Sequence, residues 1–428
     1  MENRPWKGDV RLGDETQQRL RAVGLLWPLA TSAWAAHSGR VHSWVSALIL
    51  EPEVTGVKVL VTGGAGFVGS HIADALLSGG HEVRVLDSLD PQVHSGRKTL
   101  PAYVSPDVEF VHGDTRDADV LRRALTGISV VYHQAAAVGV AQSMYQPRRY
   151  IDVNCVGTAN LLETIVTDRT NVDLLVVASS MSVYGEGEYR CERCGPSYPQ
   201  LRPGAQMARK EWEQVCPECH SGLEPCPTRE SKPLLPRSPY AISKRAQEEL
   251  CLSVGEEYKL PTIALRYFNV YGPRQCLSNP YTGLVAIFAS RILNGRSPIV
   301  FEDGMQSRDF VHVSDVAAAN LLALNAPQLV YQAVNIGTGQ RVTVRQLAEM
   351  LISLLDSGLE PAITGRCRAG DIRHCFADVA RARALLGFEA KVPFQEGAAD
   401  LAAWLAGQRP DDHVERALGE LEARGLAR

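Results

Sequence analysis

Residues 59–70, Val-Leu-Val-Thr-Gly-Gly-Ala-Gly-Phe-Val-Gly-Ser, constrain the fold more than any other part of the chain. A short β-branched run, Val57–Thr62, ends in glycines, and apolar residues at helical spacing follow over Phe67–Leu77. The turn contains three glycines at intervals of three residues, Gly63, Gly66 and Gly69. Such glycines allow a tight turn, a close approach of backbone to a pyrophosphate, and close packing of helix on strand. The free N–H groups at the helix start favour phosphate. The stretch therefore predicts a dinucleotide-binding turn.

The same alternation of strand and helix continues along the chain. Further strands are expected at 82–86, 108–112, 130–134, 174–178 and 262–266, with helices at 118–125, 150–166 and 240–254. Strands that alternate with helices indicate βαβ units and a parallel sheet. We predict an α/β fold, a Rossmann-type doubly wound parallel sheet with a smaller C-terminal substrate lobe.

An acidic residue, Asp87, follows the second expected strand. An acid at this place accepts hydrogen bonds from the adenosine ribose hydroxyls and repels a 2′-phosphate. The sequence therefore favours NAD over NADP.

The domain boundaries follow from where this pattern starts, breaks and stops. We predict a poorly structured or helical N-terminal extension over 1–56, an NAD-binding Rossmann domain over 57–265 with an insert at 187–232, a substrate-binding lobe with some Rossmann elements over 266–407, and a C-terminal tail over 408–428.

Three residues form a candidate catalytic set. Tyr240 and Lys244 stand at i and i+4 near the start of an expected helix, so they share one face. A nearby ammonium group lowers the pKa of a phenol toward the working range of an acid/base. Ser180 closes the strand at 174–179, at the edge where open α/β sheets bind ligands. The alternatives are a surface Tyr–Lys pair and a serine that only caps a helix.

Two Cys-x-x-Cys motifs lie inside the insert. They contain Cys191, Cys194, Cys216 and Cys219. This is the spacing of a zinc ribbon, in which two turns present four thiolates to one tetrahedral ion. We predict a structural zinc, which stabilises a module too small to fold alone. Free thiols or redox disulfides are the alternatives, and His220 and Cys226 are possible substitute ligands.

Charge and hydropathy restrict the partners. The net charge is −4 and the pI about 6.3, which argues against non-specific nucleic-acid binding. No run of 18 or more apolar residues lacks a charge or proline, so no transmembrane helix is expected. With four cysteines assigned to zinc, we expect a reducing, cytoplasmic location.

Further motifs occur in one order along the chain. They are Thr62–His71, His133–Ala136, Asn154 before Gly157, Ser179–Gly185, Tyr240 with Lys244, Arg266–Arg274, Arg308–Val313 and Arg368–Asp371. With these motifs, residues 57–407 resemble the extended short-chain dehydrogenase/reductase family, in its NAD-dependent sugar-nucleotide epimerase/dehydratase branch.

The resemblance implies a role for each matching residue. Tyr240 would be the acid/base on the sugar hydroxyl, Lys244 would bond the nicotinamide ribose, and Ser180 would bond the reacting oxygen. The implied cofactor site comprises Gly63, Gly66, Phe67, Val68, Gly69, Asp87, Asp114, Thr115, Ala135, Ala136, Asn154, Lys244 and Tyr267. The implied substrate site comprises Ser180, Asn269, Arg274, Arg308, Arg368 and Asp371. Arginine forks suit a diphosphate, although surface salt bridges are the alternative for each arginine.

The resemblance also implies a reaction. Dehydratases of the family carry Asp-Glu directly after the active-strand Ser/Thr, and decarboxylating relatives usually carry glutamate at the second position. This chain has Met181 and Ser182 there. What remains is oxidation at C4 to a 4-keto sugar and hydride return to the opposite face, an isomerase reaction.

The features that discriminate among substrates are few. Galactose-type epimerases often carry lysine where this chain aligns Val138. The segment 137–145, Met181 and the cysteine insert together are similar to bacterial members assigned as dTDP-L-rhamnose 4-epimerases. We therefore predict a dTDP-L-rhamnose 4-epimerase. UDP-glucose or UDP-glucuronate 4-epimerase is the alternative, and an inactive scaffold used for interactions is a second one. The resemblance further implies a homodimer formed through a four-helix bundle.

Overall fold

The computed structural model describes residues 56–427, apart from 95, 169, 278, 280, 282, 369, 406 and 409–411. The predicted N-terminal extension lies outside the described residues except for Gly56.

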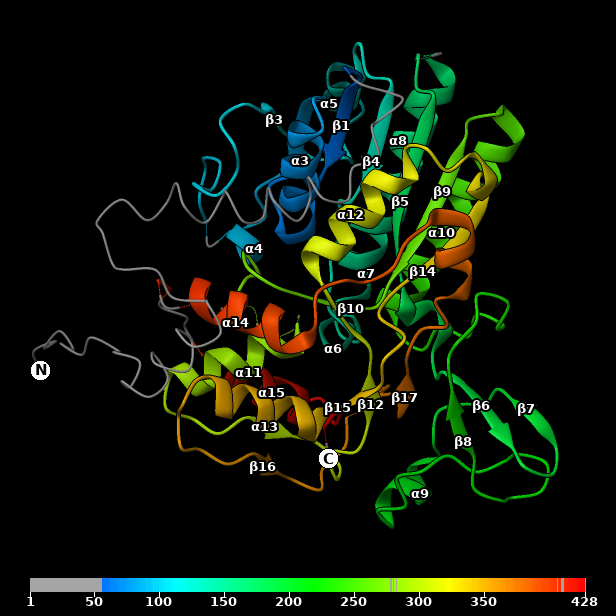
Figure 1. The fold of residues 1–428 in the computed structure, drawn as a ribbon, viewed down its shortest axis with the longest axis vertical. Helices are drawn as coiled ribbons and strands as arrows, with labels where there is room; N and C mark the ends of the chain where they lie inside the picture. The colour runs from blue at the N-terminus through cyan, green and yellow to red at the C-terminus, as the bar shows by residue number, and fades with distance from the viewer. Residues whose placement is uncertain are drawn as a thin grey trace, which may run out of the picture.

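A parallel sheet of seven strands forms the larger lobe (Figure 1). Its strands are β1 (Lys58–Thr62), β2 (Glu82–Asp87), β3 (Glu109–His112), β4 (Val130–His133), β5 (Leu174–Ser180), β9 (Thr262–Tyr267) and β14 (Gln332–Ile336). Their order across the sheet is β14-β9-β5-β4-β1-β2-β3. The order in which successive strands are added therefore reverses between β1 and β4, and ligands of open α/β sheets bind at such a switch point. The predicted doubly wound fold class is confirmed.

Helices cover both faces of this sheet. On one face lie α3 (Phe67–Ser78) and α12 (Val313–Ala323), and on the other lie α5 (Ala118–Leu125), α8 (Gly157–Thr167) and α10 (Pro239–Tyr258). Alternate residues of a strand point to opposite faces. Val59 and Val61 of β1 accordingly pack in the apolar layer under α3 and α12, whereas Leu60 packs in the layer under α8. Two apolar layers thus enclose the sheet.

The helix expected at 150–166 is interrupted. A short helix α7 (Pro147–Tyr150) is followed by a π-helical segment, η1 (Ile151–Val156), before α8 begins. Single π-turns inside helices are common at functional sites. Asn154 lies within this one, buried, and its side chain holds the backbone of Ala137.

The smaller lobe contains helices and several short strand pairs. Its helices are α11 (Leu284–Leu293), α13 (Val344–Leu354), α14 (Phe394–Leu405) and α15 (Val414–Glu422). The pairs are β10 (Asn269–Tyr271) with β13 (Phe310–His312), β11 (Ile299–Val300) with β16 (Ala362–Ile363), and β12 (Ser307–Arg308) with β15 (Val342–Thr343) and β17 (His374–Cys375). Phe288, Leu347 and Leu401 belong to its apolar core. The chain crosses between the lobes more than once, because α12 and β14 belong to the larger one.

Short elements connect these parts. They are α4 (Pro91–His94), α6 (Val140–Ser143), and the turns η2 (Met181–Tyr184), η3 (Pro327–Leu329) and η4 (Ala382–Leu386).

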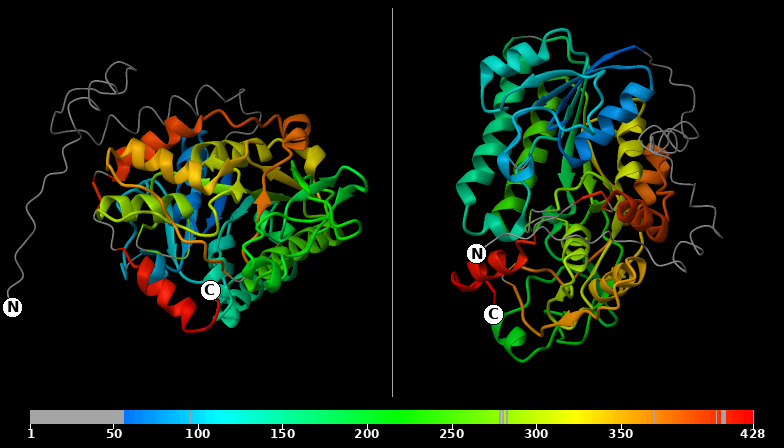
Figure 2. Two further views of the ribbon diagram at one scale, coloured as in Figure 1. Left: turned by 90° about the horizontal axis from the view of Figure 1, so that it is seen from below. Right: turned by 90° about the vertical axis from the view of Figure 1, so that its left-hand side faces the viewer.

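The insert forms a module of its own beside the smaller lobe (Figures 1 and 2). It contains β6 (Glu188–Cys191), β7 (Gly195–Ser197), α9 (Gly204–Ala208) and β8 (Glu224–Cys226). The strands form an antiparallel sheet in the order β7-β6-β8. Tyr189, Cys191, Cys216 and Leu223 make its small buried core.

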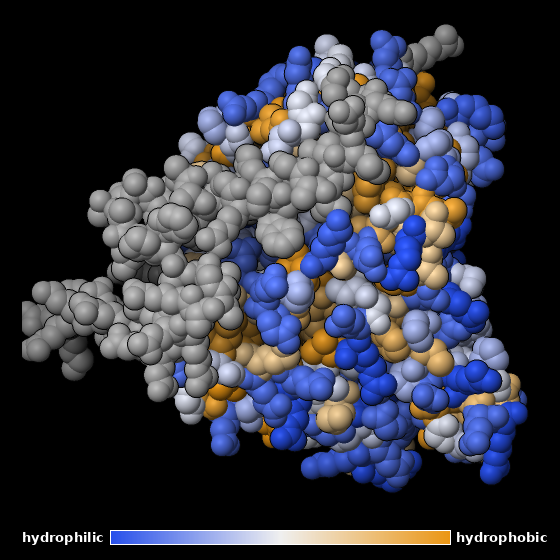
Figure 3. All heavy atoms as spheres, in the orientation of Figure 1, coloured by the Kyte–Doolittle hydropathy of each residue, from blue (hydrophilic) through white to orange (hydrophobic). Residues whose placement is uncertain are grey.

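The surface of the face seen in Figure 3 is mixed. Hydrophilic residues cover much of the smaller lobe and the insert, with apolar residues between them. Among the described residues, every helix is too short or too polar to cross a membrane.

Candidate active site

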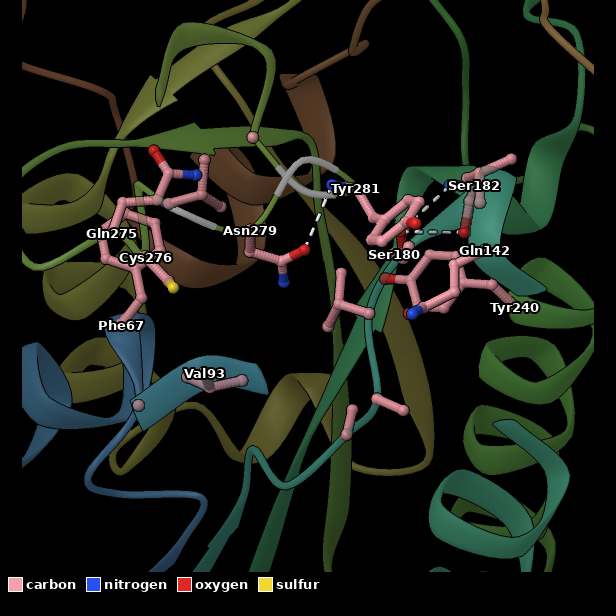
Figure 4. Close-up of a pocket in the computed structure, with 18 of the residues that line it drawn as sticks. Phe67, Val93, Gln142, Ser180, Ser182, Tyr240, Gln275, Cys276, Asn279 and Tyr281 are labelled. Carbon is pink, nitrogen blue, oxygen red and sulfur yellow. Dashed lines mark hydrogen bonds between the residues drawn. The ribbon is translucent and has the colours of Figure 1, made fainter. Parts of the chain in front are cut away.

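A cleft of about 870 Å³ opens between the two lobes at the carboxyl ends of the strands. The β1–α3 turn, the end of β2 and the end of β5 line it from the larger lobe, and α11 and α15 line it from the smaller lobe. Figure 4 shows side chains from both sides pointing into the cleft, with Phe67 and Val93 opposite Ser180 and Tyr240.

The glycine turn lies at one end of the cleft and leaves no room for side chains. Gly63 has a φ of +68°, and a Cβ there would lie 2.8 Å from the backbone of Ala135. A Cβ on Gly69 would lie 2.3 Å from the carbonyl oxygen of Gly63. All five predicted residues of the turn, Gly63, Gly66, Phe67, Val68 and Gly69, line the cleft. The turn can therefore present bare backbone to a pyrophosphate.

Gly69→Ala tests this turn. Because the new methyl group would collide with backbone rather than with a flexible side chain, we expect a loss of NAD affinity of about 1–3 kcal/mol, which is about 5- to 150-fold. Isothermal titration with NAD measures it. Gly204→Ala is the control, since a Cβ there meets nothing within 4 Å. Unchanged NAD affinity in Gly69→Ala would contradict the assignment.

Asp87, Asp114 and Thr115 line the same end of the cleft. The Asp87 carboxylate accepts hydrogen bonds from the N–H groups of Ala65 (3.0 Å) and Leu89 (2.9 Å), and its burial raises its pKa. Asp114 is held by the guanidinium group of Arg116, whose hydrogen bonds lower the pKa of Asp114. Both acids are thus fixed in place near the glycine turn, where an adenosine would lie.

Three more predicted cofactor residues, Ala135, Ala136 and Tyr267, line the cleft, and Asn154 does not. The Asn154 side chain accepts from the N–H of Ala137 at 2.7 Å, donates to its carbonyl at 3.0 Å, and donates to the Ser243 hydroxyl at 2.9 Å. Ser243 lies on α10. Asn154 therefore ties the loop after β4 to the helix that carries the catalytic pair, and positions both.

The three candidate catalytic residues, Ser180, Tyr240 and Lys244, all line the cleft. Ser238 caps α10 by accepting from the N–H of Ala241 at 3.1 Å, and Pro239 fixes the first helical turn. Tyr240 and Lys244 therefore lie in the first two turns of α10 and line the cleft with Ser180. Figure 4 places Tyr240, Ser180 and Gln142 on one side of it.

Burial is the largest influence on the pKa of Tyr240 and of Lys244. Burial raises the pKa of Tyr240, and the hydrogen bond with Ser180 opposes that rise only in part. The Lys244 ammonium group donates to the Ala178 carbonyl and to the Gln247 side chain. Burial also lowers the pKa of Lys244 to about 8. Burial thus disfavours the phenolate form of Tyr240.

The predicted substrate residues all line the cleft. Asn269 projects a buried side-chain oxygen that has no partner among the described residues. Arg368 pairs with Asp371 at 2.8 Å and lies over the ring of Phe301, 4.5 Å from its centroid. Arg308 donates to three backbone carbonyls of its own lobe, at 2.8 to 3.0 Å.

Arg274 has its partners on the cofactor side. It forms an ion pair with Asp74 of α3 at 2.7 Å, and it stacks on Tyr103, 5.5 Å from the ring centroid. Tyr103 itself donates to the carbonyl of Ala65 in the glycine turn. Arg274 thus connects the smaller lobe to the glycine turn, with Arg308 and Arg368 on the opposite wall.

Sequence reasoning missed several residues that line the cleft. Tyr281 lies in a loop without any pattern, and its hydroxyl meets that of Tyr145 at 2.9 Å. Both hydroxyls donate to Glu420 of α15 at 3.0 Å. The segment predicted as a tail therefore supplies a wall of the site, and Leu421 of α15 lines it. Arg237, which directly precedes the cap of α10, lines it too.

The four cysteines of the two Cys-x-x-Cys motifs converge in the insert. Their sulfur atoms all lie within 4.8 Å of one another. A Zn–S bond of about 2.3 Å would place tetrahedral sulfurs about 3.8 Å apart, so the cluster has the right size. His220 and Cys226, the possible substitutes, are not part of it.

Comparison with known proteins decides the family. Residues 59–203 and 215–337 match the NAD dependent epimerase/dehydratase family. The chain belongs to this family. The predicted membership in the extended short-chain dehydrogenase/reductases and the predicted class of enzyme, an NAD-dependent epimerase, are confirmed.

Individual members of the epimerase/dehydratase family are similar over most of the chain. A dTDP-L-rhamnose 4-epimerase of Burkholderia thailandensis is 34% identical over 360 residues, which cover 82% of this chain and 96% of the relative. The structure of a UDP-glucose 4-epimerase from Thermotoga maritima with UDP-glucose matches with a TM-score of 0.67 at 32% identity, covering 82% of this chain and 98% of the other. A Thermus thermophilus UDP-glucose 4-epimerase in complex with NAD matches with a TM-score of 0.64 at 34% identity, covering 82% and 99%.

Proposed function

We propose that the chain is an NAD-dependent nucleotide-sugar 4-epimerase that acts on dTDP-L-rhamnose. The observation that carries the reaction type is the pairing of Tyr240 and Ser180 with Met181 beside them. Met181 is buried and apolar, and the Ser182 hydroxyl donates to Ser180 at 2.9 Å. Neither side chain at these two positions can supply the second acid/base that an elimination would need. A reaction confined to C4 fits the set.

The residues present fit an NAD molecule. Its pyrophosphate suits the turn at Gly63 and Gly69, where there is no room for a Cβ. Its adenosine ribose suits the fixed carboxylate of Asp87. Lys244 would hold the nicotinamide ribose. When bound, NAD supplies the acceptor and the donor of the hydrogen that C4 loses and regains. The positive charge of its nicotinamide would also favour the phenolate of Tyr240, which the protein alone disfavours.

The chain's own residues then have simple tasks. Tyr240 takes the proton of the C4 hydroxyl and returns it after C4 has inverted. Ser180 donates a hydrogen bond to the reacting oxygen. The nucleotide diphosphate would be held by the wall of the smaller lobe, through Asn269, Arg308 and Arg368, while the 4-keto sugar rotates. Each of these positions carries a residue that can do its task, which disfavours an inactive scaffold used for interactions.

The sugar is the finer part of the proposal. An apolar Met181 beside the sugar tolerates a 6-methyl group better than a carboxylate, and the Burkholderia relative supports this substrate. One observation favours UDP-glucuronate instead: Arg237 lines the cleft and could pair with a 6-carboxylate. UDP-glucose requires neither feature.

A panel of nucleotide sugars separates these substrates. The NAD-loaded enzyme is incubated with dTDP-L-rhamnose, UDP-glucose and UDP-glucuronate, and inversion at C4 is followed by NMR. We expect turnover of dTDP-L-rhamnose at least tenfold above the other two. Inertness toward it, with turnover of either UDP-sugar, would overturn the assignment of the sugar and keep the reaction.

We also propose that the four-cysteine cluster holds one structural zinc ion. Four thiolates close the coordination shell, so this metal has no open position for catalysis. Metal analysis of protein purified without chelators should find about one zinc per chain, and Cys216→Ser should lose the metal and lower the melting temperature. Cys226→Ser is the control, because Cys226 lies outside the cluster. Zinc-free, fully stable wild-type protein would refute the site. Reduced thiols also support the predicted cytoplasmic location.

The predicted homodimer is a further proposal. Ile151 and Val156 around η1 and Ile242 on the adjacent α10 are apolar and exposed by 38%, 44% and 49%. Exposed apolar side chains on neighbouring helices suit a helix-pair interface. Sedimentation equilibrium would give the mass.

A further inference from the structure

The insert is fastened to the smaller lobe along β17 and the residues after it. The Gly187 N–H donates to the carbonyl of His374 at 2.8 Å. Thr228 exchanges backbone hydrogen bonds with Phe376 and Asp378, at 2.8 and 3.0 Å. Figure 1 shows β17 next to β6 and β8. Backbone hydrogen bonds therefore join the module directly to the smaller lobe.

Arg202 of the insert reaches into the lobe from the side. Its guanidinium group is buried and donates to both carboxylate oxygens of Glu302, each at 2.8 Å. The same group donates to the backbone carbonyl of Asp371 at 3.3 Å. The insert thus contacts directly the backbone of a predicted substrate residue.

Arg373 of the lobe makes the reciprocal contact. Its side chain is fully buried, and it donates to Glu213 of the insert at 2.5 and 3.0 Å. It also donates to Glu302 at 2.9 Å and to Asp303 at 2.7 and 2.9 Å. The two buried arginines share Glu302, so insert and lobe form one charged network. Buried charges of this kind keep their partners in place, because an unpaired one is costly.

The residues next to this network form the wall of the cleft where a nucleotide diphosphate would bind. Phe301 precedes Glu302, and its ring lies under the guanidinium group of Arg368. Arg308 donates to the carbonyls of Ile372 and Arg373, at 2.8 and 3.0 Å. The positions of Phe301, Arg368 and Arg308 therefore depend on backbone that the network fixes.

We propose that the zinc module is a positioning element for the nucleotide end of the substrate, acting through Arg202, Glu213 and Arg373. This role rests on the proposed nucleotide-sugar function. It implies that loosening the module weakens binding of the nucleotide diphosphate and leaves the glycine turn and Tyr240 unaffected. Among the described residues, the hydrogen bonds of the module reach the sheet near the active strand only as far as the Tyr184 carbonyl, to which Lys232 donates at 2.9 Å, and the Arg266 side chain.

Glu213→Gln in the full, NAD-loaded chain is the test, with Glu211→Gln as the matched control. Glu213 is half-exposed, so its loss should leave the fold intact, whereas the Glu211 side chain pairs with Arg209 on the surface of the insert. Calorimetry with UDP and with dTDP gives the nucleotide Kd, and steady-state kinetics give KM and kcat. We expect Glu213→Gln to raise Kd and KM about tenfold with kcat within twofold of wild type, and Glu211→Gln to change neither. Removal of zinc by a chelator should raise the same Kd without changing NAD affinity.

Each other outcome is decisive. Wild-type nucleotide Kd in both Glu213→Gln and the zinc-depleted protein would overturn the positioning role. Equal weakening by Glu211→Gln and Glu213→Gln, or a loss of kcat rather than of affinity, would overturn it as well. A wild-type protein that binds NAD but neither UDP nor dTDP would instead refute the proposed function, and the positioning role with it.

Discussion

Tyr240→Phe should lose turnover by about 10²- to 10⁴-fold, the range of a general acid/base, and still bind NAD with wild-type affinity. The phenol is buried in the first turn of α10 beside Ser180, and removal of its hydroxyl leaves the glycine turn untouched. C4 inversion followed by NMR gives the rate, and titration with NAD gives the affinity.

Tyr258→Phe is the control for that experiment. Tyr258 ends the same helix and is 62% exposed, so the same chemical change there should leave turnover unchanged. Turnover within about tenfold of wild type in Tyr240→Phe would show that another group moves the proton. Loss of NAD affinity together with turnover would show that the substitution has damaged the site.

Glu248→Ala should lower the free energy of unfolding by about 3–5 kcal/mol, because it removes the carboxylate that pairs with the buried Arg266. Glu248 lies on α10, one turn beyond Lys244. It accepts from Arg266 at 2.6 and 3.0 Å and from the Ser179 hydroxyl at 2.5 Å. Arg266 is on β9 and Ser179 is on β5, so one carboxylate joins the catalytic helix to two strands of the sheet.

Denaturant unfolding measures the effect, and the next residue provides the comparison. Glu249 forms an exposed i, i+4 pair with Arg245 at 2.7 Å, and such pairs contribute about 0.5 kcal/mol or less. Glu249→Ala should therefore be nearly neutral. If the two substitutions lowered the free energy of unfolding equally, the Glu248 network would not be what holds α10 on the sheet.

The parts of the site that could be predicted from the sequence are those that local chemistry dictates. The glycine spacing allows only a turn that exposes backbone, and the Ser-Pro pair before Tyr240 sets where α10 begins. The cysteine spacing similarly brings two sulfurs together in each Cys-x-x-Cys turn. In each case neighbouring residues along the chain determine the geometry.

The rest depends on contacts between distant segments. Nothing near Tyr281 in the sequence indicates that it meets Tyr145 and Glu420, because this cluster exists only once α15 has packed on the cleft. The partners of Lys244 could not be predicted for the same reason. A cation four residues from a phenol suggests coupling, whereas the Ala178 carbonyl that accepts its hydrogen bond comes from β5.

The wall made by α15 is fastened to the smaller lobe by contacts of two kinds. Arg366 pairs with Glu422 and Arg296 with Glu415, all partly exposed, whereas the pair of Arg291 with Asp412 at 3.2 Å is buried. Salt screens exposed pairs and hardly affects buried ones. Higher ionic strength should therefore weaken the two exposed contacts of this segment and leave the buried contact of Arg291 with Asp412 in place.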